Sequence, residues 1–519
     1  AQAGEALAPH LPKLFPKLYR MQYDPSPAVQ DAMSGIIKSL VDDVRGAVDK
    51  YYAEVMAECI SSISGRLWRS REAACCAAAD ALSGRPHELI APHLEQLWTL
   101  SLRALDDIKE TVRSAATTLA RALASNTLRL VDPKLTKPDL CASTAASVFP
   151  IILEKGITSS AKEVSAFSVG FLIKLVEAAG EQCRPHIPDV AVCMLEAMST
   201  MESATINYLS LHSQKYDIDT AKLEEARANA NSGSPAHDAL QLCVRFLDEE
   251  SLAALVPRLT SLAGSGVGLP TRVGVAKLTQ SLAARHASSV KPHAKTLCKA
   301  FISGADRESS AATRKAYYAA VAALTKLMSA KAIGKIVDNA VHAAERDEDG
   351  AVRSAQLLRE ISRGSPDALA PHLSAILPLA FLLKHSTVAD PSRPGKTKQT
   401  PIGAAFADVW DENTASAASS LRLYQKECVG RVVEALQASS YERKREGARA
   451  AITLATELKG DVASNGAAAE VIPALVANVP GRIYEGKEEV LDAIGTVVST
   501  SAKAMCAEGA TVGNSGACE

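Results

Sequence analysis

The sequence predicts an all-α protein, a HEAT-repeat α-solenoid made of about eleven antiparallel helix pairs. Three observations lead to this fold class. A Pro-His pair followed by apolar residues recurs with starts 83, 93, 107 and 79 residues apart, each about twice the 40–47 residues of a HEAT or armadillo repeat. A second helical pattern, rich in small residues, recurs between these pairs. Aromatic residues make up only 4% of the 519-residue chain while alanine is abundant, which suits closely packed helices.

The Pro-His pairs predict helix starts, because proline is favoured at the first helical position, where its missing N–H is not needed. Copies lie about two repeats apart, too far for their histidines to share a metal ion. The copies occupy residues 8–11, 91–94, 184–187, 291–294 and 370–373.

The second helix of a pair is clearest in "DDIKETVRSAATTLARAL" at 106–123. Its apolar residues recur at helical spacing, and its small residues allow close approach to a partner helix. A close copy is "GAVRSAQLLREI" at 350–361. Weaker copies lie at 27–40, 68–82, 163–175, 312–324 and 443–458.

An acidic residue stands six positions before arginine in two of these segments, as Asp107/Arg113 and Asp347/Arg353. This spacing resembles the Asp/Arg ladder of HEAT repeats, so we expect these side chains to bridge successive turns. The ladder is incomplete: Gln30 follows Asp24 at the arginine position, and Arg314 lies eight residues after Asp306. Exposed ion pairs contribute only about 0–1 kcal/mol each, so apolar stacking is expected to hold the array together.

Helix pairs are expected to begin near residues 8, 47, 86, 140, 184, 250, 289, 331, 366, 417 and 465. These form three blocks, over 8–206, 239–386 and 404–506. Between them lie a polar insertion with its own short helix (207–238) and a Pro/Gly/Lys/Thr loop (387–403), which we expect to be mobile. The tail 507–519 is expected to be disordered.

Composition narrows the function classes. Lys plus Arg number 57 and Asp plus Glu 58, so no charge excess points to nucleic acid or an anionic membrane. The eleven cysteines include no CxxC pair, which predicts a reducing compartment. The longest apolar run, 376–383, is far short of the roughly 20 residues that span a bilayer, so no membrane insertion is expected. The chain begins without Met, and the array begins abruptly, so we expect a fragment.

No catalytic motif stands out. The glycine-rich stretch 263–274 lacks the preceding strand or the GK[ST] of a phosphate-binding loop, and is interpreted as an inter-helix turn. Asp106 and Asp107 are interpreted as turn and helix N-terminal residues. We therefore predict no enzyme, and no catalytic, cofactor-binding or metal-binding residue.

Three residues are candidates for contact with a partner. Trp410 borders the 387–403 loop, and it either packs in the core and anchors that loop or meets a partner. Arg443 and Lys444 lie in the basic stretch "YERKREGAR" (441–449), for which a solvated helix face is the alternative.

An ordered set of segments resembles the family of large HEAT-repeat proteasome adapter and scaffold proteins. It includes "LFPKLYRMQYDP" (14–25), "WRSREAAC" (68–75), "INYLSLH" (206–212), "VWDEN" (409–413) and "YEGKEEVLDAI" (484–494). The resemblance implies a C-terminal portion of a longer protein. It also implies a non-enzymatic adapter that tethers the core and regulatory particles of the proteasome and links proteasomes to other cellular components in protein quality control. Such a protein would be cytoplasmic and nuclear.

Two rivals share this architecture. One is a nuclear transport receptor of the importin type, for which more acidic inner faces are expected than in this neutral chain. The other is a scaffold subunit for a phosphatase or a translation factor.

Overall fold

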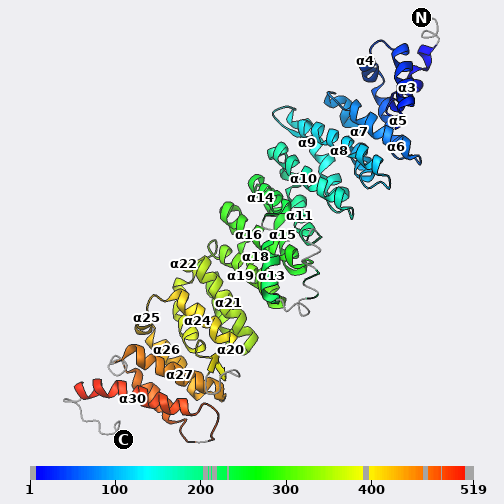
Figure 1. The fold of residues 1–519 in the computed structure, drawn as a ribbon. Helices are drawn as coiled ribbons and strands as arrows, with labels where there is room; N and C mark the ends of the chain where they lie inside the picture. Colours follow the sequence, from blue (N-terminus) through cyan, green and yellow to red (C-terminus); the bar gives the residue numbers. More distant parts are fainter. Residues whose placement is uncertain are drawn as a thin grey trace. The chain divides into compact units, whose positions relative to one another are not determined.

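The computed structural model describes residues 7–200, 202, 208–209, 212, 219–230, 233–389, 397–459, 466–480 and 482–508. The chain divides into two compact units, an N-terminal unit (Ala1–Arg285) and a C-terminal unit (His286–Glu519). Each is a stack of antiparallel helix pairs in sequence order (Figure 1).

The N-terminal unit contains six helix pairs in its described residues. The pairs are α2 (Leu11–Met21) with α3 (Pro27–Leu40), α5 (Tyr52–Ile63) with α6 (Trp68–Ala81), α7 (His87–Ala104) with α8 (Glu110–Val131), α9 (Pro138–Ile151) with α10 (Lys162–Ala179), α11 (Ile187–Thr200) with α14 (Pro235–Phe246), and α15 (Glu249–Ser265) with α16 (Leu269–Arg285). The shorter elements are 3₁₀ turns at Ala8–His10 and Gly180–His186, α4 (Val44–Lys50), a π-helical turn at Ile152–Ile157, and α13 (Thr220–Ala230).

The C-terminal unit adds five pairs in its described residues. They are α18 (Ala294–Arg307) with α19 (Ala311–Thr325), α20 (Ala330–Arg346) with α21 (Glu348–Gly364), α23 (Leu373–Leu383) with α24 (Pro401–Asn413), α26 (Gln425–Gln437) with α27 (Tyr441–Leu458), and α29 (Ala467–Val476) with α30 (Glu488–Glu508). The shorter elements are α17 (Ala287–Val290), α22 (Pro366–Leu369), α25 (Ala417–Leu423), 3₁₀ turns at Lys291–His293 and Ala370–His372, and strands β1 (Thr387–Ala389) and β2 (Thr397–Gln399). The predicted HEAT-repeat α-solenoid class is confirmed.

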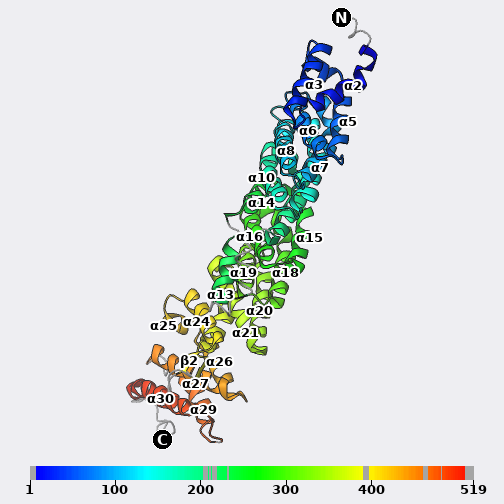
Figure 2. The same ribbon diagram turned by 45° about the vertical axis from the view of Figure 1, so that its right-hand side comes forward.

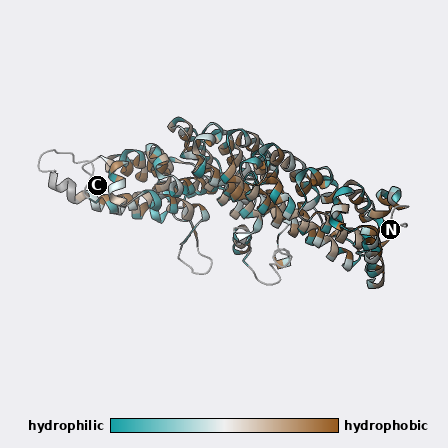
Figure 3. Ribbon diagram, turned by 90° about the horizontal axis from the view of Figure 1, so that it is seen from above, coloured by the Kyte–Doolittle hydropathy of each residue, from teal (hydrophilic) through white to brown (hydrophobic). Residues whose placement is uncertain are grey.

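The helices of each unit form two layers. In the N-terminal unit, second helices α6, α8, α10 and α14 contact one another in turn, while first helices such as α5 and α7 form the opposite layer (Figure 2). Apolar and polar residues alternate along the helices (Figure 3), as expected of amphipathic helices that bury one face. Trp98 illustrates the core: it is fully buried, stacks on Phe171 with ring centroids 4.7 Å apart, and donates from Nε1 to Thr127 Oγ1 at 3.0 Å.

A proline lies inside six first helices of the described chain. It removes one backbone hydrogen bond and bends the helix, so these first helices are expected to curve around the second layer. The six are Pro16, Pro92, Pro150, Pro257, Pro378 and Pro473.

The Pro-His prediction holds at four of the five copies, where the pair ends a 3₁₀ turn directly before a helix. It is wrong for Pro92-His93, which lies inside α7. That helix begins one turn earlier, after Pro86, so another Pro-His pair (86–87) provides the start and Pro92 is an interior bend.

The predicted block boundaries differ from the structure in two places. The second half of the predicted insertion contains α13, but α14 already begins at Pro235, inside its predicted range. The predicted loop 387–403 contains an antiparallel ribbon that pairs Thr387 with Gln399, and α24 begins at Pro401 within it. Of the predicted tail 507–519, the first two residues belong to α30, which ends at Glu508, and 509–519 lie outside the described residues.

Two stretches of the described chain are long and apolar enough to cross a membrane by length and composition alone, Pro138–Ile157 and Pro366–Leu383. About half of each is buried against neighbouring helices, 56% and 50%, as in the core helices of a stack. The glycine-rich stretch 263–274 is the predicted inter-helix turn: it joins α15 to α16, and Gly268 adopts a φ of +85°.

Candidate interaction surface

Several of the turns that join the first to the second helix of a pair share one hydrogen-bond pattern. A side chain from the start of the second helix donates to backbone carbonyls of the preceding turn. Arg71 donates from Nη1 to the carbonyls of Gly65 and Arg66, six and five residues earlier, at 3.1 and 2.9 Å. Arg113 and Arg314 repeat this geometry in their own turns. Gln30 substitutes for arginine in the first pair and donates to the Asp24 carbonyl at 2.7 Å. The residue six positions before the arginine therefore supplies a backbone acceptor.

The acidic side chain at that position has a separate partner within the same turn. Asp24, Asp107 and Glu308 each accept the backbone N–H two residues later at 2.9 Å. Those N–H groups belong to the residues that precede α3, α8 and α19. Glu308, rather than Asp306, is thus the acidic counterpart of Arg314, a pairing that the sequence pattern missed.

The ion pairs between successive helix pairs do not follow the predicted six-residue spacing between an acidic residue and arginine. The Arg71 guanidinium forms a bidentate pair with Asp107 of the next helix pair at 2.7 and 3.0 Å. Arg353 lies 3.8 Å from Asp306 of the preceding pair. Asp347 caps α21 by accepting the Gly350 N–H and also pairs with Arg346.

The environment of Asp107 depresses its pKa. Desolvation by burial raises that pKa, but the hydrogen bonds from Arg71 and the Lys109 N–H, together with the charges of Arg71 and Arg113, lower it below the ordinary 3.8. The Asp107 side chain is 12% exposed and that of Arg71 is 19% exposed. The pair that joins the two turns is therefore largely shielded from solvent.

Trp410 packs in the core of the C-terminal unit. It is 3% exposed, with its ring 5.4 Å from that of Phe381, and the Lys384 ammonium lies 4.3 Å from its centroid. Burial lowers the pKa of Lys384, and the indole face partly replaces lost water around the cation. Of the two interpretations of Trp410, this position favours packing in the core.

Arg443 and Lys444 lie on the first turn of α27 and are half-buried. Arg443 contacts Glu446 at 3.4 Å, and burial raises the pKa of Glu446. A cavity of about 460 Å³ opens nearby, but other residues of α27 line it, together with the base of the ribbon and the starts of α21 and α24. Arg449 lines this cavity and donates to the Thr387 hydroxyl and the His385 carbonyl. It also pairs with Glu489 at 2.5 Å.

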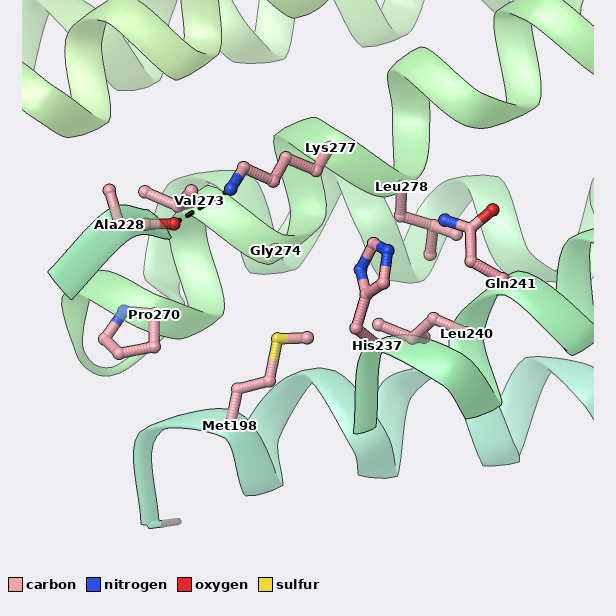
Figure 4. Close-up of a pocket in the computed structure, with 10 residues that line it drawn as sticks. All are labelled: Met198, Ala228, His237, Leu240, Gln241, Pro270, Val273, Gly274, Lys277 and Leu278. Carbon is pink, nitrogen blue, oxygen red and sulfur yellow. Dashed lines mark hydrogen bonds between the residues drawn. The ribbon is translucent and has the colours of Figure 1, made fainter. Parts of the chain in front are cut away.

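Helix α13 of the polar insertion is tied to the N-terminal unit at two points. Arg227 forms a bidentate pair with Glu202 at 2.6 and 2.7 Å. Lys277 donates from Nζ to the Ala228 carbonyl at 2.9 Å across a narrow pocket (Figure 4). The pocket volume, about 20 Å³, is close to that of a single water molecule, so α13 packs on α16 without leaving a ligand cavity there.

The chemistry of the described residues is that of a packed scaffold. No group of three or more His, Cys, Asp or Glu side chains gathers there in a way that could hold a metal ion. Burial raises the pKa of the Cys59, Cys183 and Cys298 thiols to about 12, which disfavours the nucleophilic thiolate. Burial, with the charges of Lys384 and Arg449, lowers the pKa of His385 to about 3.

Comparisons with known proteins point to one family. Residues 183–343 match the model of the HEAT-repeat domain of the proteasome adapter and scaffold protein ECM29. The chain is 33% identical over 500 residues to the human proteasome adapter and scaffold protein ECM29, covering 96% of this chain. It is 28% identical over 490 residues to the Schizosaccharomyces pombe proteasome component ecm29, covering 92% of this chain.

The chain spans about a quarter of these relatives, 26% of the human protein and 28% of the fission yeast protein. Among solved structures, it overlaps Kap121p bound to Nup53p with a TM-score of 0.38 and 12% identity, over 98% of this chain and 48% of that one. The overlap with importin beta has a TM-score of 0.30 and 10% identity, over 95% of this chain and 66% of that one. Overlaps this low assign no function.

Proposed function

Since the chain belongs to the ECM29 family along almost its entire length, we propose that it acts as a proteasome-binding adapter and scaffold. The observation that carries this proposal is the 33% identity to the human proteasome adapter over 500 residues. In the finer form of the proposal, the chain contributes to tethering the core and regulatory particles of the proteasome and links proteasomes to other components in quality control.

The physical character of the chain supports a role in binding. A stack of helix pairs presents an extended surface, on which many modest contacts add up to affinity. The titratable groups that are buried, such as Glu446, Cys59 and Cys243, lie in helix packing. We propose accordingly that the chain acts without catalysis and without a cofactor, in the cytoplasm and the nucleus, with no nucleic-acid partner and no membrane insertion.

Affinity purification of the tagged chain from cells, followed by mass spectrometry, tests the proposal. We expect subunits of both proteasome particles among the enriched proteins. Enrichment of one particle alone would reject the tethering form but retain the adapter. Recovery of the small GTPase of nuclear transport without proteasome subunits would favour the importin-type rival.

A further inference from the structure

Two successive first-to-second-helix turns of the N-terminal unit expose large apolar side chains. Ile108 in the α7–α8 turn is 96% exposed, and Leu67 in the α5–α6 turn is 70% exposed. Single exposed apolar residues are ordinary. These two stand out because they occupy equivalent turns of neighbouring helix pairs, with half-buried Trp68 beside Leu67.

The two turns touch, so the three side chains form one surface, here named the Leu67–Ile108 surface. Arg71 of one helix pair binds Asp107 of the next at 2.7 Å. The Lys109 ammonium lies 5.7 Å from the centre of the Trp68 ring. The second helices α6 and α8 pack directly against each other.

The spacing of the turns determines what kind of chain fits. Packed helices lie about 8–10 Å apart, so Leu67 and Ile108 are expected to be about that far apart along the stack. An extended polypeptide advances about 3.1–3.3 Å per residue, and three residues cover that distance. A polyproline II segment has three residues per turn, so its side chains at positions i and i+3 face the same way.

The two ends of the Leu67–Ile108 surface differ in charge. Arg66 and Arg69 flank Leu67, are exposed, and form no ion pair with a carboxylate of the described residues. At the Ile108 end the exposed charges alternate in sign, with Asp106, Lys109 and Glu110, while Asp107 is bound by Arg71. An acidic residue of a partner therefore belongs at the Leu67 end.

We propose that the Leu67–Ile108 surface docks an extended segment of a partner protein, with two apolar side chains three residues apart and acidic residues at one end. The apolar side chains pack on Leu67 with Trp68 and on Ile108, and the acidic residues pair with Arg66 and Arg69. This inference goes beyond the proposed function, because it specifies the chemistry of a partner segment whichever protein carries it.

A synthetic peptide tests the inference. The probe is a fluorescein-labelled 12-residue peptide with two glutamates at one end, two leucines three residues apart, and proline and serine elsewhere. Fluorescence anisotropy with the whole chain should show saturable binding. A peptide of the same composition with adjacent leucines should bind at least about tenfold more weakly, because only one leucine can then reach its site.

Matched variants of the chain locate the site. Ile108→Ser should weaken binding at least about tenfold, since burial of an isoleucine side chain is lost. Leu135→Ser is the control: Leu135 is also exposed, at 67%, but lies beyond the other end of the 22-residue helix α8, about 33 Å away. Its effect should stay within about twofold. The double change Arg66→Gln and Arg69→Gln should reduce the dependence of affinity on salt.

Three results would overturn the proposal: no saturable binding by the unmodified chain, equal binding of the two peptides, or equal effects of Ile108→Ser and Leu135→Ser. All the substituted side chains are exposed, so the variants should fold. Helical circular dichroism matching that of the unmodified chain verifies this before the affinities are compared.

Discussion

Replacing Arg71 should most clearly destabilise the contact between two neighbouring helix pairs. The change Arg71→Gln removes the bidentate ion pair with Asp107 and leaves at most a hydrogen bond to the carbonyls of its own turn, as Gln30 makes in the first helix pair. Hydrogen bonds to charged groups contribute about 1.5–3 kcal/mol each when buried. Since these side chains are 19% and 12% exposed, and Asp107 retains the Lys109 N–H, we expect a local loss of about 2–3 kcal/mol in total.

Hydrogen exchange measured by mass spectrometry is the suitable assay, because a long stack unfolds locally rather than in one step. Amides at the starts of α6 and α8 should exchange about 30- to 150-fold faster in Arg71→Gln. Arg113→Gln is the comparison, since the Arg113 side chain donates to the carbonyls of its own turn and forms no ion pair within hydrogen-bond distance in the described residues. It should cause a smaller change, confined to the start of α8. Exchange in Arg71→Gln within twofold of the unmodified chain would refute the reasoning.

The contribution of the Arg71–Asp107 pair to local stability should depend on pH. The pKa of Asp107 is lowered in the folded chain, so its contribution is fully present above its ordinary value of 3.8 and is lost as pH falls through the lower folded value. In Arg71→Gln that pKa returns toward its ordinary value. The acid-induced increase in exchange at these two turns should therefore be smaller in the variant than in the unmodified chain.

Three further predictions concern the rest of the chain. Trp410→Ala should destabilise the packing of α23 on α24 by about 3–5 kcal/mol, seen as faster exchange in both helices; unchanged exchange there would mean that the indole is not a core residue. Replacing His93 and His372 by Gln should leave metal content and melting temperature nearly unchanged, since neither is expected to be a ligand; a stoichiometric metal that disappears on substitution would contradict this. Limited trypsin digestion should cut at Lys396 or Lys398 before the helical units, since Lys398 is exposed on the ribbon; early cuts elsewhere with this segment intact would show that it is ordered.

Sequence periodicity was enough to predict the repeat architecture, because the amphipathic pattern of each second helix is local. The starts of α8 and α21 follow directly from the segments around Val112 and Val352. The bend at Pro92 was missed because the Pro-His pattern looks the same inside a helix as at its start. The ribbon that pairs 387–389 with 397–399 was missed because its strands have only three residues each.

The contacts between helix pairs could not be predicted from spacing alone. Arg113 donates to backbone carbonyls. Because every residue has a backbone carbonyl, the sequence does not indicate which one accepts the hydrogen bond. The ionic partner of Asp107 is Arg71, 36 residues away, and only the stacking of α6 on α8 brings the two together. The burial of Trp410 likewise depends on Phe381 and Lys384 from the preceding helix and its end.

Co-sedimentation with purified proteasomes tests the central claim most directly. The chain, mixed with assembled proteasomes and centrifuged through a glycerol gradient, should shift into the proteasome fractions. Arg443→Gln and Lys444→Gln should weaken this only slightly, whereas deletion of several helix pairs should weaken it strongly, because contacts are distributed along the stack. A chain that stays at the top of the gradient at concentrations where assembled proteasomes are intact would contradict the account.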